Sequence, residues 1–121
     1  LPEVSGRDVA IIGQGSIGLL FSYVAKAAGA RTVTGIDPVN REKLSRTYGV
    51  DHAVRATSDR WVSQLAAEDR ADVVIEAVGH QVATLGHAIA AAAPGGTVYY
   101  FGVADDETYP IDVRAMLRKN L

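Results

Sequence analysis

Three closely spaced glycines stand out near the start of the chain, in the hexapeptide GQGSIG at residues 13–18. Glycine lacks a Cβ, so the backbone can turn sharply there and another group can approach the main chain closely. A turn of this kind that opens a helix also presents unpaired N–H groups and the positive end of the helix dipole. Such a turn binds anions, and phosphate is the obvious candidate. The motif alone is weak evidence, because the chain has 12 glycines among its 121 residues.

Asp37 strengthens this interpretation, because it follows the third glycine by about 20 residues and closes a second predicted strand. In the dinucleotide-binding fingerprint the first glycine, Gly13, makes the tight turn and the second, Gly15, lets the pyrophosphate approach. The third, Gly18, lets helix and strand pack closely. An acid at the end of the second strand hydrogen-bonds the adenosine ribose. These features occur in the required order, so the sequence predicts a dinucleotide site rather than a glycine turn without a ligand.

Asp37 also bears on which dinucleotide is bound. A 2′-phosphate about 4 Å from its carboxylate would cost on the order of 4 kcal/mol at an effective dielectric constant of 20, before screening by salt. We therefore expect NAD rather than NADP. Arg41 is the one nearby residue that could offset this preference, because guanidinium groups pair well with phosphate. The alternative is a helix-surface arginine that at most stacks near the adenine.

The elements that must hold these residues alternate between strand and helix patterns. This alternation predicts an α/β fold, a doubly wound parallel sheet of the Rossmann type, with about five strands in one domain, residues 1–121. The helix after the glycines is expected to end at Gly29 and to bury Ile17, Leu20, Phe21, Val24 and Ala28. The predicted strands are residues 9–12, 32–37, 52–54, 72–79 and 97–102. Other predicted helices start at Pro38 and at Arg114, and a third, capped by Ser58 or Asp59, carries Trp61, Val62 and Leu65. One more helix carries Val82, Leu85 and Ile89 and runs into Pro94-Gly95-Gly96.

Composition argues against several classes of function. Lysine and arginine number 12 against 14 aspartates and glutamates, so we expect neither a nucleic-acid partner nor an anionic membrane surface. No apolar run approaches the roughly 18 residues that span a membrane, and the first residues do not resemble a signal segment, which favours a cytoplasmic protein. The chain has no cysteine, and its 3 histidines lack the spacing of a metal-binding pair. We therefore expect no metal site in this chain.

Over nearly its whole length the chain resembles the coenzyme-binding domain of the medium-chain, zinc-type alcohol dehydrogenases. The glycine motif is shared by many nucleotide enzymes, whereas DVVIEAVG followed by PGG and a strand ending in Gly102-Val103 is more specific. The segments that carry the resemblance are VAIIGQGSIGLL at 9–20, AKAAGA at 25–30, Asp37, YGVDHAV at 48–54, DVVIEAVG at 72–79 and PGGTVYYFGV at 94–103.

The resemblance implies an NAD(H)-binding domain. The cofactor-binding residues it implies are Gly13, Gly15, Ser16, Ile17, Gly18, Asp37 and Arg41, with Ala77, Val78 and Gly79 after the fourth strand and Phe101, Gly102 and Val103 after the fifth. It places zinc, the catalytic residues and the site for a small alcohol-type substrate in another domain, so none of these is expected here. The family's sixth strand is missing from the sequence. We therefore expect a segment of a longer dehydrogenase that forms a homo-oligomer.

Three polar residues near the predicted cleft have alternative interpretations. Glu76, inside the fourth strand, is expected to be a structural acid paired to a neighbouring loop or helix rather than a general base. His80 follows Gly79 at the cleft, where it is either a cofactor contact or a solvent-facing loop residue. His87, on a helix, is expected only to pack.

The leading hypothesis for function is NAD(H) binding for hydride transfer in a zinc-type alcohol or polyol dehydrogenase. One alternative is an S-adenosylmethionine-dependent methyltransferase, which also has a glycine loop and an acid after the second strand. That ligand lacks a pyrophosphate, so the third glycine is less expected. A second alternative is a regulatory module that senses NAD(H) and catalyses nothing. The cofactor domain alone does not identify the substrate.

Overall fold

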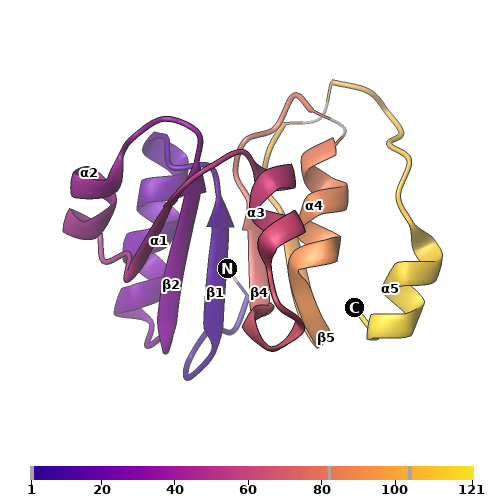
Figure 1. Cartoon of the computed structure of the whole chain (residues 1–121), viewed down its shortest axis with the longest axis horizontal. Coiled ribbons are helices and arrows are strands. Elements are labelled where there is room, and N and C mark those ends of the chain that lie inside the picture. Colours follow the sequence, from indigo (N-terminus) through magenta and orange to yellow (C-terminus); the bar gives the residue numbers. More distant parts are fainter. Residues whose placement is uncertain (1, 82, 104) are drawn as a thin grey trace.

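In the part of the chain that the structure describes, five strands form one parallel sheet at the centre of the molecule (Figure 1). The computed structural model describes residues 2–81, 83–103 and 105–121. The strand order is β3-β2-β1-β4-β5, so consecutive strands run outward from β1 first to one edge and then to the other. The predicted doubly wound α/β fold is confirmed. The strands are β1 (Asp8–Ile12), β2 (Thr32–Asp37), β3 (His52–Arg55), β4 (Ala71–Glu76) and β5 (Ala92–Tyr100).

Helices cover both faces of this sheet. In Figure 1, α3 and α4 lie in front of the sheet, and α1 lies behind it. This division follows from right-handed crossovers that run in opposite directions from the central strand. The helices are α1 (Ser16–Ala27), α2 (Glu42–Thr47), α3 (Ser58–Gln64), the 3₁₀ turn η1 (Ala67–Asp69), α4 (Ala83–Ala91) and α5 (Val113–Lys119). Val82, which was assigned to the helix before β5, lies outside the described residues.

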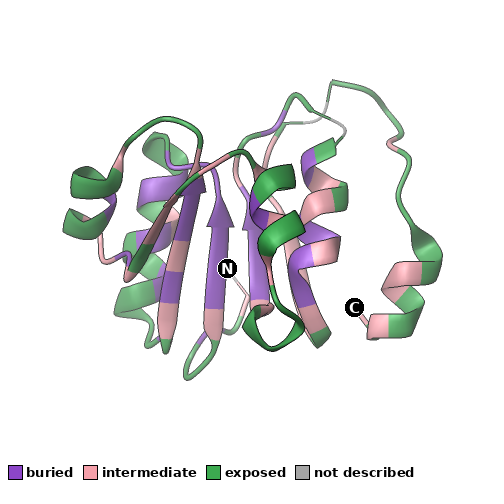
Figure 2. Cartoon of the chain, in the orientation of Figure 1, coloured by how far each residue is buried: buried purple, intermediate pink, exposed green. Residues whose placement is uncertain are grey.

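Burial is concentrated in the central strands of the sheet (Figure 2). Successive residues of β1 fall into two apolar clusters, one on each face of the sheet. Val9 and Ile11 of β1 belong to the apolar cluster on the α1 side of the sheet. Ala10 and Ile12 belong to the cluster that includes Trp61 of α3. A strand with both faces covered needs an unbroken apolar run, as the sequence of β1 shows.

The buried face of α1 differs from the predicted one. The residues it buries are Gly18, Leu19, Ser22 and Ala25. Leu20 is 54% exposed and Val24 is 44% exposed, although both were expected to face the core. The cause is the contact between Gly18 and the end of β1, because it turns the face that carries Gly18 toward the sheet and leaves Leu20 and Val24 outside.

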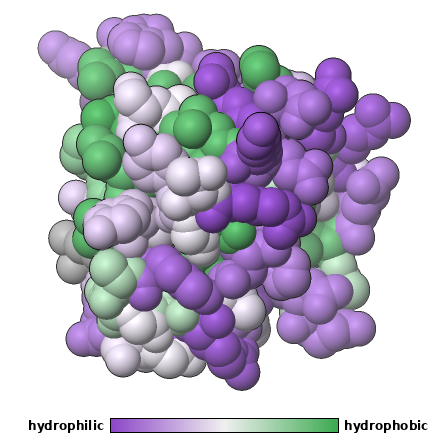
Figure 3. All heavy atoms as spheres, turned by 90° about the vertical axis from the view of Figure 1, so that its left-hand side faces the viewer, coloured by the Kyte–Doolittle hydropathy of each residue, from purple (hydrophilic) through white to green (hydrophobic). Residues whose placement is uncertain are grey.

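The outward apolar residues of α1 form a surface patch with Phe101, which follows β5. Phe21 and Phe101 meet edge to face, with ring centroids 4.9 Å apart. Ile17, Leu20 and Val24 line the same shallow groove of about 210 Å³. Hydrophobic side chains also gather along one edge of the surface in Figure 3, on the side where α1 covers the sheet.

Two element boundaries differ from the predicted ones, and each difference has a local cause. The helix expected from Pro38 begins at Glu42, because the Asp37 carboxylate accepts a hydrogen bond from Val39 N at 2.8 Å and holds a turn there. Pro94-Gly95-Gly96 does not end a helix but lies inside β5. The pairing of β4 with β5 shifts register there, from Ala71–Ala92 to Val73–Thr97, so this segment is an irregularity within the strand.

Candidate functional site

The glycine loop leaves β1 and enters α1 at the carboxyl edge of the sheet. Gly13 has φ of +99°, a conformation that only glycine adopts without strain. A Cβ on Gly18 would overlap the carbonyl oxygen of Gly13, so the helix start and the strand end are in backbone contact. These two glycines therefore fix the geometry of the turn, as the fingerprint requires.

Gly15 has a different environment, because a Cβ there would meet nothing within 4 Å. It is the N-cap residue of α1, and its carbonyl accepts the hydrogen bond of Leu19 N at 2.9 Å. The N–H groups at the start of a helix have no acceptor within the helix. No acidic residue occupies the first turn of α1. The backbone at Gly15 and the start of α1 is therefore accessible to an anion.

Asp37 lies beside this loop, because β1 and β2 pair in parallel with Ile12 opposite Ile36. Its Oδ2 accepts a hydrogen bond from Gln14 N at 2.8 Å, and only 15% of its side chain is exposed. Arg41 Nε lies 3.8 Å from the same oxygen. A carboxylate has about four acceptor positions, so the bonds to Gln14 and Val39 leave room for hydroxyl donors from a ligand.

Gln14 was not predicted as a site residue, although its side chain connects the glycine loop to α1 and α2. Its side chain is buried and donates to Ser22 Oγ of α1 at 3.2 Å, while Ser45 Oγ of α2 donates to its Oε1 at 2.9 Å. Gly35 in β2 makes room for this amide, since a Cβ there would lie 2.6 Å from it. The sequence offers no signal for this network, because the three polar residues belong to no motif and Ser45 lies 31 positions from Gln14.

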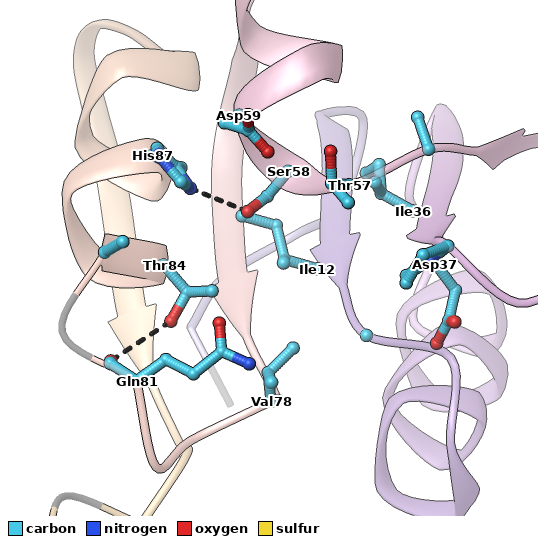
Figure 4. A pocket seen from close by; sticks show the side chains of 14 residues that line it. Ile12, Ile36, Asp37, Thr57, Ser58, Asp59, Val78, Gln81, Thr84 and His87 are labelled. Atoms are coloured by element: carbon cyan, nitrogen blue, oxygen red, sulfur yellow. Dashed lines mark hydrogen bonds between the residues drawn. The ribbon is translucent and has the colours of Figure 1, made fainter.

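A cavity of about 610 Å³ opens next to the glycine loop (Figure 4). Of the predicted cofactor-binding residues, the structure brings Gly13, Asp37 and Val78 together in its wall. The other lining residues come from the ends of β1 and β2, from the start of α3 with the residues before it, and from the first half of α4 with the residues before it. They are Ile12, Ile36, Pro38, Ala56, Thr57, Ser58, Asp59, Gln81, Ala83, Thr84 and His87.

The wall formed by α3 and α4 was not predicted. Ser58 Oγ and His87 Nδ1 are 2.7 Å apart and are hydrogen-bonded. His87 was expected only to pack, and Ser58 or Asp59 was expected to cap α3, whereas the N-cap residue is Thr57. No local pattern identifies these residues, since their proximity depends on how α3 and α4 pack together.

The loops after β4 and β5 lie against each other. A Cβ on Gly102 would overlap the backbone of Gly79, and His80 N donates to Val103 O at 2.7 Å. Val78 faces the cavity, while the side chain of Phe101 packs on α1 instead. The backbone of Ala77 is bonded to the end of β1, through Ala77 N and Ile12 O at 2.9 Å.

Glu76 is fully buried and has the structural function that we expected for it. Its Oε1 accepts hydrogen bonds from Val78 N at 2.5 Å and Gly79 N at 3.0 Å. Its Oε2 accepts a hydrogen bond from Thr84 Oγ1 at 3.0 Å. One carboxylate thus joins the β4 loop to the start of α4. Because Glu76 is fully buried and all three of these contacts are to groups of the protein, the geometry gives it a positioning function.

His80 does not line this cavity. Its Nδ1 lies 2.6 Å from Asp105 Oδ1, and both side chains are more than half exposed. Among the described residues no group of three His, Cys, Asp or Glu side chains could hold a metal ion. No described helix is long and apolar enough to cross a membrane.

Comparisons with known proteins agree with this geometry. The model of a family described as zinc-binding dehydrogenases matches residues 16–121. An L-threonine 3-dehydrogenase of Saccharopolyspora erythraea is 36% identical over 122 residues, covering 98% of this chain and 35% of that protein. A D-guloside 3-dehydrogenase of Escherichia coli K12 is 34% identical over 103 residues, covering 82% of this chain and 29% of that protein.

Solved structures lead to the same family. The alcohol dehydrogenase TADH of Thermus sp. ATN1 has a TM-score of 0.83 and 31% identity, covering 98% of this chain and 35% of that one. A protein of Sinorhizobium meliloti 1021 described as a zinc-binding dehydrogenase bound to NADP has a TM-score of 0.85 and 30% identity, covering 98% of this chain and 36% of that one. The chain spans about a third of the length of these proteins. The chain belongs to the zinc-binding dehydrogenase family, in which it corresponds to the dinucleotide-binding domain.

Proposed function

We propose that this chain is the NAD(H)-binding domain of a longer, homo-oligomeric zinc-type dehydrogenase that oxidises a small alcohol. The observation that carries the proposal is the position of Asp37, whose carboxylate is bonded to the glycine loop and lines the cavity. The family match favours this reading over a methyltransferase. The remaining alternative is a regulatory module that binds NAD(H) and catalyses nothing. An assay of whether the longer protein reduces NAD with an alcohol as the substrate tests it.

Each part of the site has a function in this proposal. The N–H groups at the start of α1 bind the pyrophosphate above Gly15, where the backbone is open. Asp37 accepts hydrogen bonds from the adenosine ribose hydroxyls, and the cavity beside it holds the adenine. The loops at residues 77–79 and 101–103 orient the nicotinamide half. NAD, when bound, accepts the hydride that leaves the alcohol carbon.

Asp37 makes NAD the preferred dinucleotide. Its carboxylate has little exposure, so salt and water screen it less than a surface charge. In NADP, the 2′-phosphate on the ribose would lie next to the negatively charged Asp37 carboxylate. At a separation of 4 Å and a dielectric constant of 20, this repulsion would cost about 4 kcal/mol. Arg41, 3.8 Å from the same carboxylate, offsets part of this repulsion.

Titration calorimetry of the 121-residue chain with NADH, NADPH and S-adenosylmethionine tests the proposal. We expect NADH to bind at least tenfold more tightly than NADPH, and Asp37→Asn to narrow that gap. Gly15→Ala is expected to remove binding without unfolding the chain, because its Cβ meets only the space left for the ligand. Asp106→Asn, the same change at an exposed site away from the cavity, is the control. Binding of S-adenosylmethionine alone would overturn the proposal.

A further inference from the structure

We infer that Gln14 is a positioning residue for dinucleotide selection, because its buried amide holds the glycine loop where Asp37 meets the 2′ position of the adenosine ribose. This inference rests on the proposed function, in which Asp37 is the acid that binds the ribose. It goes beyond that function by assigning part of the preference for NADH over NADPH to a buried side chain.

The amide of Gln14 has a protein partner for each of its polar groups, and the residue is 1% exposed. Its Nε2 donates to Gly13 O at 3.1 Å and to Ser22 Oγ at 3.2 Å. Its Oε1 accepts a hydrogen bond from Ser45 Oγ at 2.9 Å. Ser22 Oγ in turn donates to Gly18 O at 2.8 Å. A buried polar network whose members are all paired is rigid, so this one fixes the loop against both helices.

The strand that ends in Asp37 makes room for this amide. Gly35 lies inside β2, where glycine weakens a strand because it has no side chain to pack. A Cβ on Gly35 would lie 2.6 Å from Cδ of Gln14. An interior glycine of this kind marks the close approach of another group. Gly35 and Asp37 are two residues apart and lie on the same face of the sheet, so the amide packs directly beside the residue pair that leads to the acid.

Gln14 also holds the Asp37 carboxylate through its own backbone. Gln14 N donates to Asp37 Oδ2 at 2.8 Å, and Val39 N donates to Oδ1 at 2.8 Å. The partner Ser45 belongs to α2, which follows Arg41, and Arg41 Nε lies 3.8 Å from Asp37 Oδ2. One residue therefore contacts the loop that orients the carboxylate and the helix that follows the guanidinium.

Selection between the two dinucleotides depends on where this carboxylate lies. A hydrogen bond to the ribose 2′-hydroxyl weakens steeply when donor and acceptor separate beyond about 3.2 Å. The repulsion of a 2′-phosphate also falls as the distance grows. A displaced carboxylate would thus weaken NADH and relieve NADPH, so the two affinities would converge. A general loss of stability would instead weaken both dinucleotides by the same factor.

Gln14→Met is the first variant to test, because methionine is unbranched and flexible like glutamine but lacks the amide. Titration calorimetry of the wild-type chain is expected to give a Kd for NADH at least tenfold tighter than for NADPH. In Gln14→Met we expect this ratio to fall below about threefold, chiefly because NADH binds about tenfold more weakly after losing one hydrogen bond. Gln64→Met, the same change at an exposed position of α3, is the matched control and should keep the wild-type ratio.

Two further variants test whether Gln14 acts through the network and through Asp37. Ser45→Ala removes one hydrogen bond to the amide and should narrow the ratio at least about twofold. It decides the question when circular dichroism shows that Gln14→Met does not fold. In an Asp37→Asn background, Gln14→Met should change the ratio no further, because residues that act through one interaction are not additive.

The possible results separate this inference from the proposed function. A folded Gln14→Met chain that keeps the wild-type ratio would overturn the inference and leave NAD(H) binding intact, even where both dinucleotides bind more weakly. An unchanged ratio in Ser45→Ala, or a further change in the Asp37→Asn background, would also overturn it. A wild-type chain that binds neither dinucleotide would overturn the proposed function, and this inference with it.

Discussion

Replacing Gly18 by alanine should destabilise the fold, whereas the same replacement at Gly86 should stabilise it. Both glycines lie within helices, where alanine is favoured over glycine by about 1 kcal/mol. A Cβ on Gly86 meets nothing within 4 Å. A Cβ on Gly18 would lie 2.7 Å from the carbonyl carbon of Gly13 and closer to its oxygen. The two changes therefore share their helix propensity and differ in steric cost.

The magnitude follows from these contacts. Ordinary contact begins near 3.4 Å, so relief of the contact with the carbonyl carbon alone would move α1 away from β1 by about 0.7 Å, and the closer oxygen requires more. Overpacking of this kind costs about 1–3 kcal/mol, and more where backbone must move. After the gain in propensity, we expect Gly18→Ala to lose about 2 kcal/mol of unfolding free energy and Gly86→Ala to gain about 1 kcal/mol.

Thermal unfolding followed by circular dichroism measures both effects. At about 4 °C per kcal/mol for a domain of this size, the midpoint should fall by about 8 °C for Gly18→Ala and rise by about 4 °C for Gly86→Ala. Urea unfolding at 25 °C gives an independent value. A Gly18→Ala chain as stable as the wild type would refute the reasoning, because it would mean that the close contact with Gly13 does not fix the start of α1.

Three further outcomes are expected. Leu19→Ala should lower the unfolding free energy by about 2–4 kcal/mol, because Leu19 is 6% exposed, whereas Leu20→Ala, at 54% exposed, should cost under about 1 kcal/mol in the same urea titration. Glu76→Gln should cost about 1–3 kcal/mol, because the amide turns one acceptor of a buried network into a donor; an unchanged urea midpoint would contradict this. A hydrogen bond from Arg31 lowers the pKa of Asp8 in the folded chain, so this pair stabilises the fold above the unfolded pKa of about 3.9 and its contribution disappears as the pH falls below that value. Asp8→Asn should therefore reduce the loss of unfolding free energy that occurs below pH 4. If the variant loses as much unfolding free energy there as the wild type, the Asp8–Arg31 pair does not stabilise the fold.

The parts of the site that follow from local chemistry could be predicted from the sequence. Gly13 and Asp37 end adjacent strands, and strand ends of a parallel sheet meet at one edge, so their proximity follows from the fold class. The orientation of α1 could not be predicted in the same way. Residues 17, 20, 21 and 24 and residues 18, 19, 22 and 25 both have helical spacing, and hydrophobicity favours the first set. The contact of Gly18 with the loop selects the second.

The cavity wall formed by α3 and α4 could not be predicted from the sequence for a different reason. Ser58 and His87 are separated by 29 positions and meet because α3 and α4 pack on the same face of the sheet. Neither residue lies in a motif, and each has an ordinary environment when considered alone. The position of Pro94-Gly95-Gly96 inside β5 is similar, since a glycine-rich turn and a bulge use the same residues. Only the pairing with β4 distinguishes them.

The central position of β1 also has a consequence for the order in which the domain folds. Its contact with β2 closes a segment of 24 residues, as between Asp8 and Thr32, and its contact with β4 closes one of 64, as between Asp8 and Asp72. The longer closure costs roughly 0.9 kcal/mol more in chain entropy. We therefore expect β1, α1 and β2 to gain protected amides first in pulsed hydrogen exchange, with β4 later; simultaneous protection would contradict this order. The glycine loop and Asp37 would then form before the wall that carries Val78 and His87, so the two sides of the cavity would be completed in separate steps.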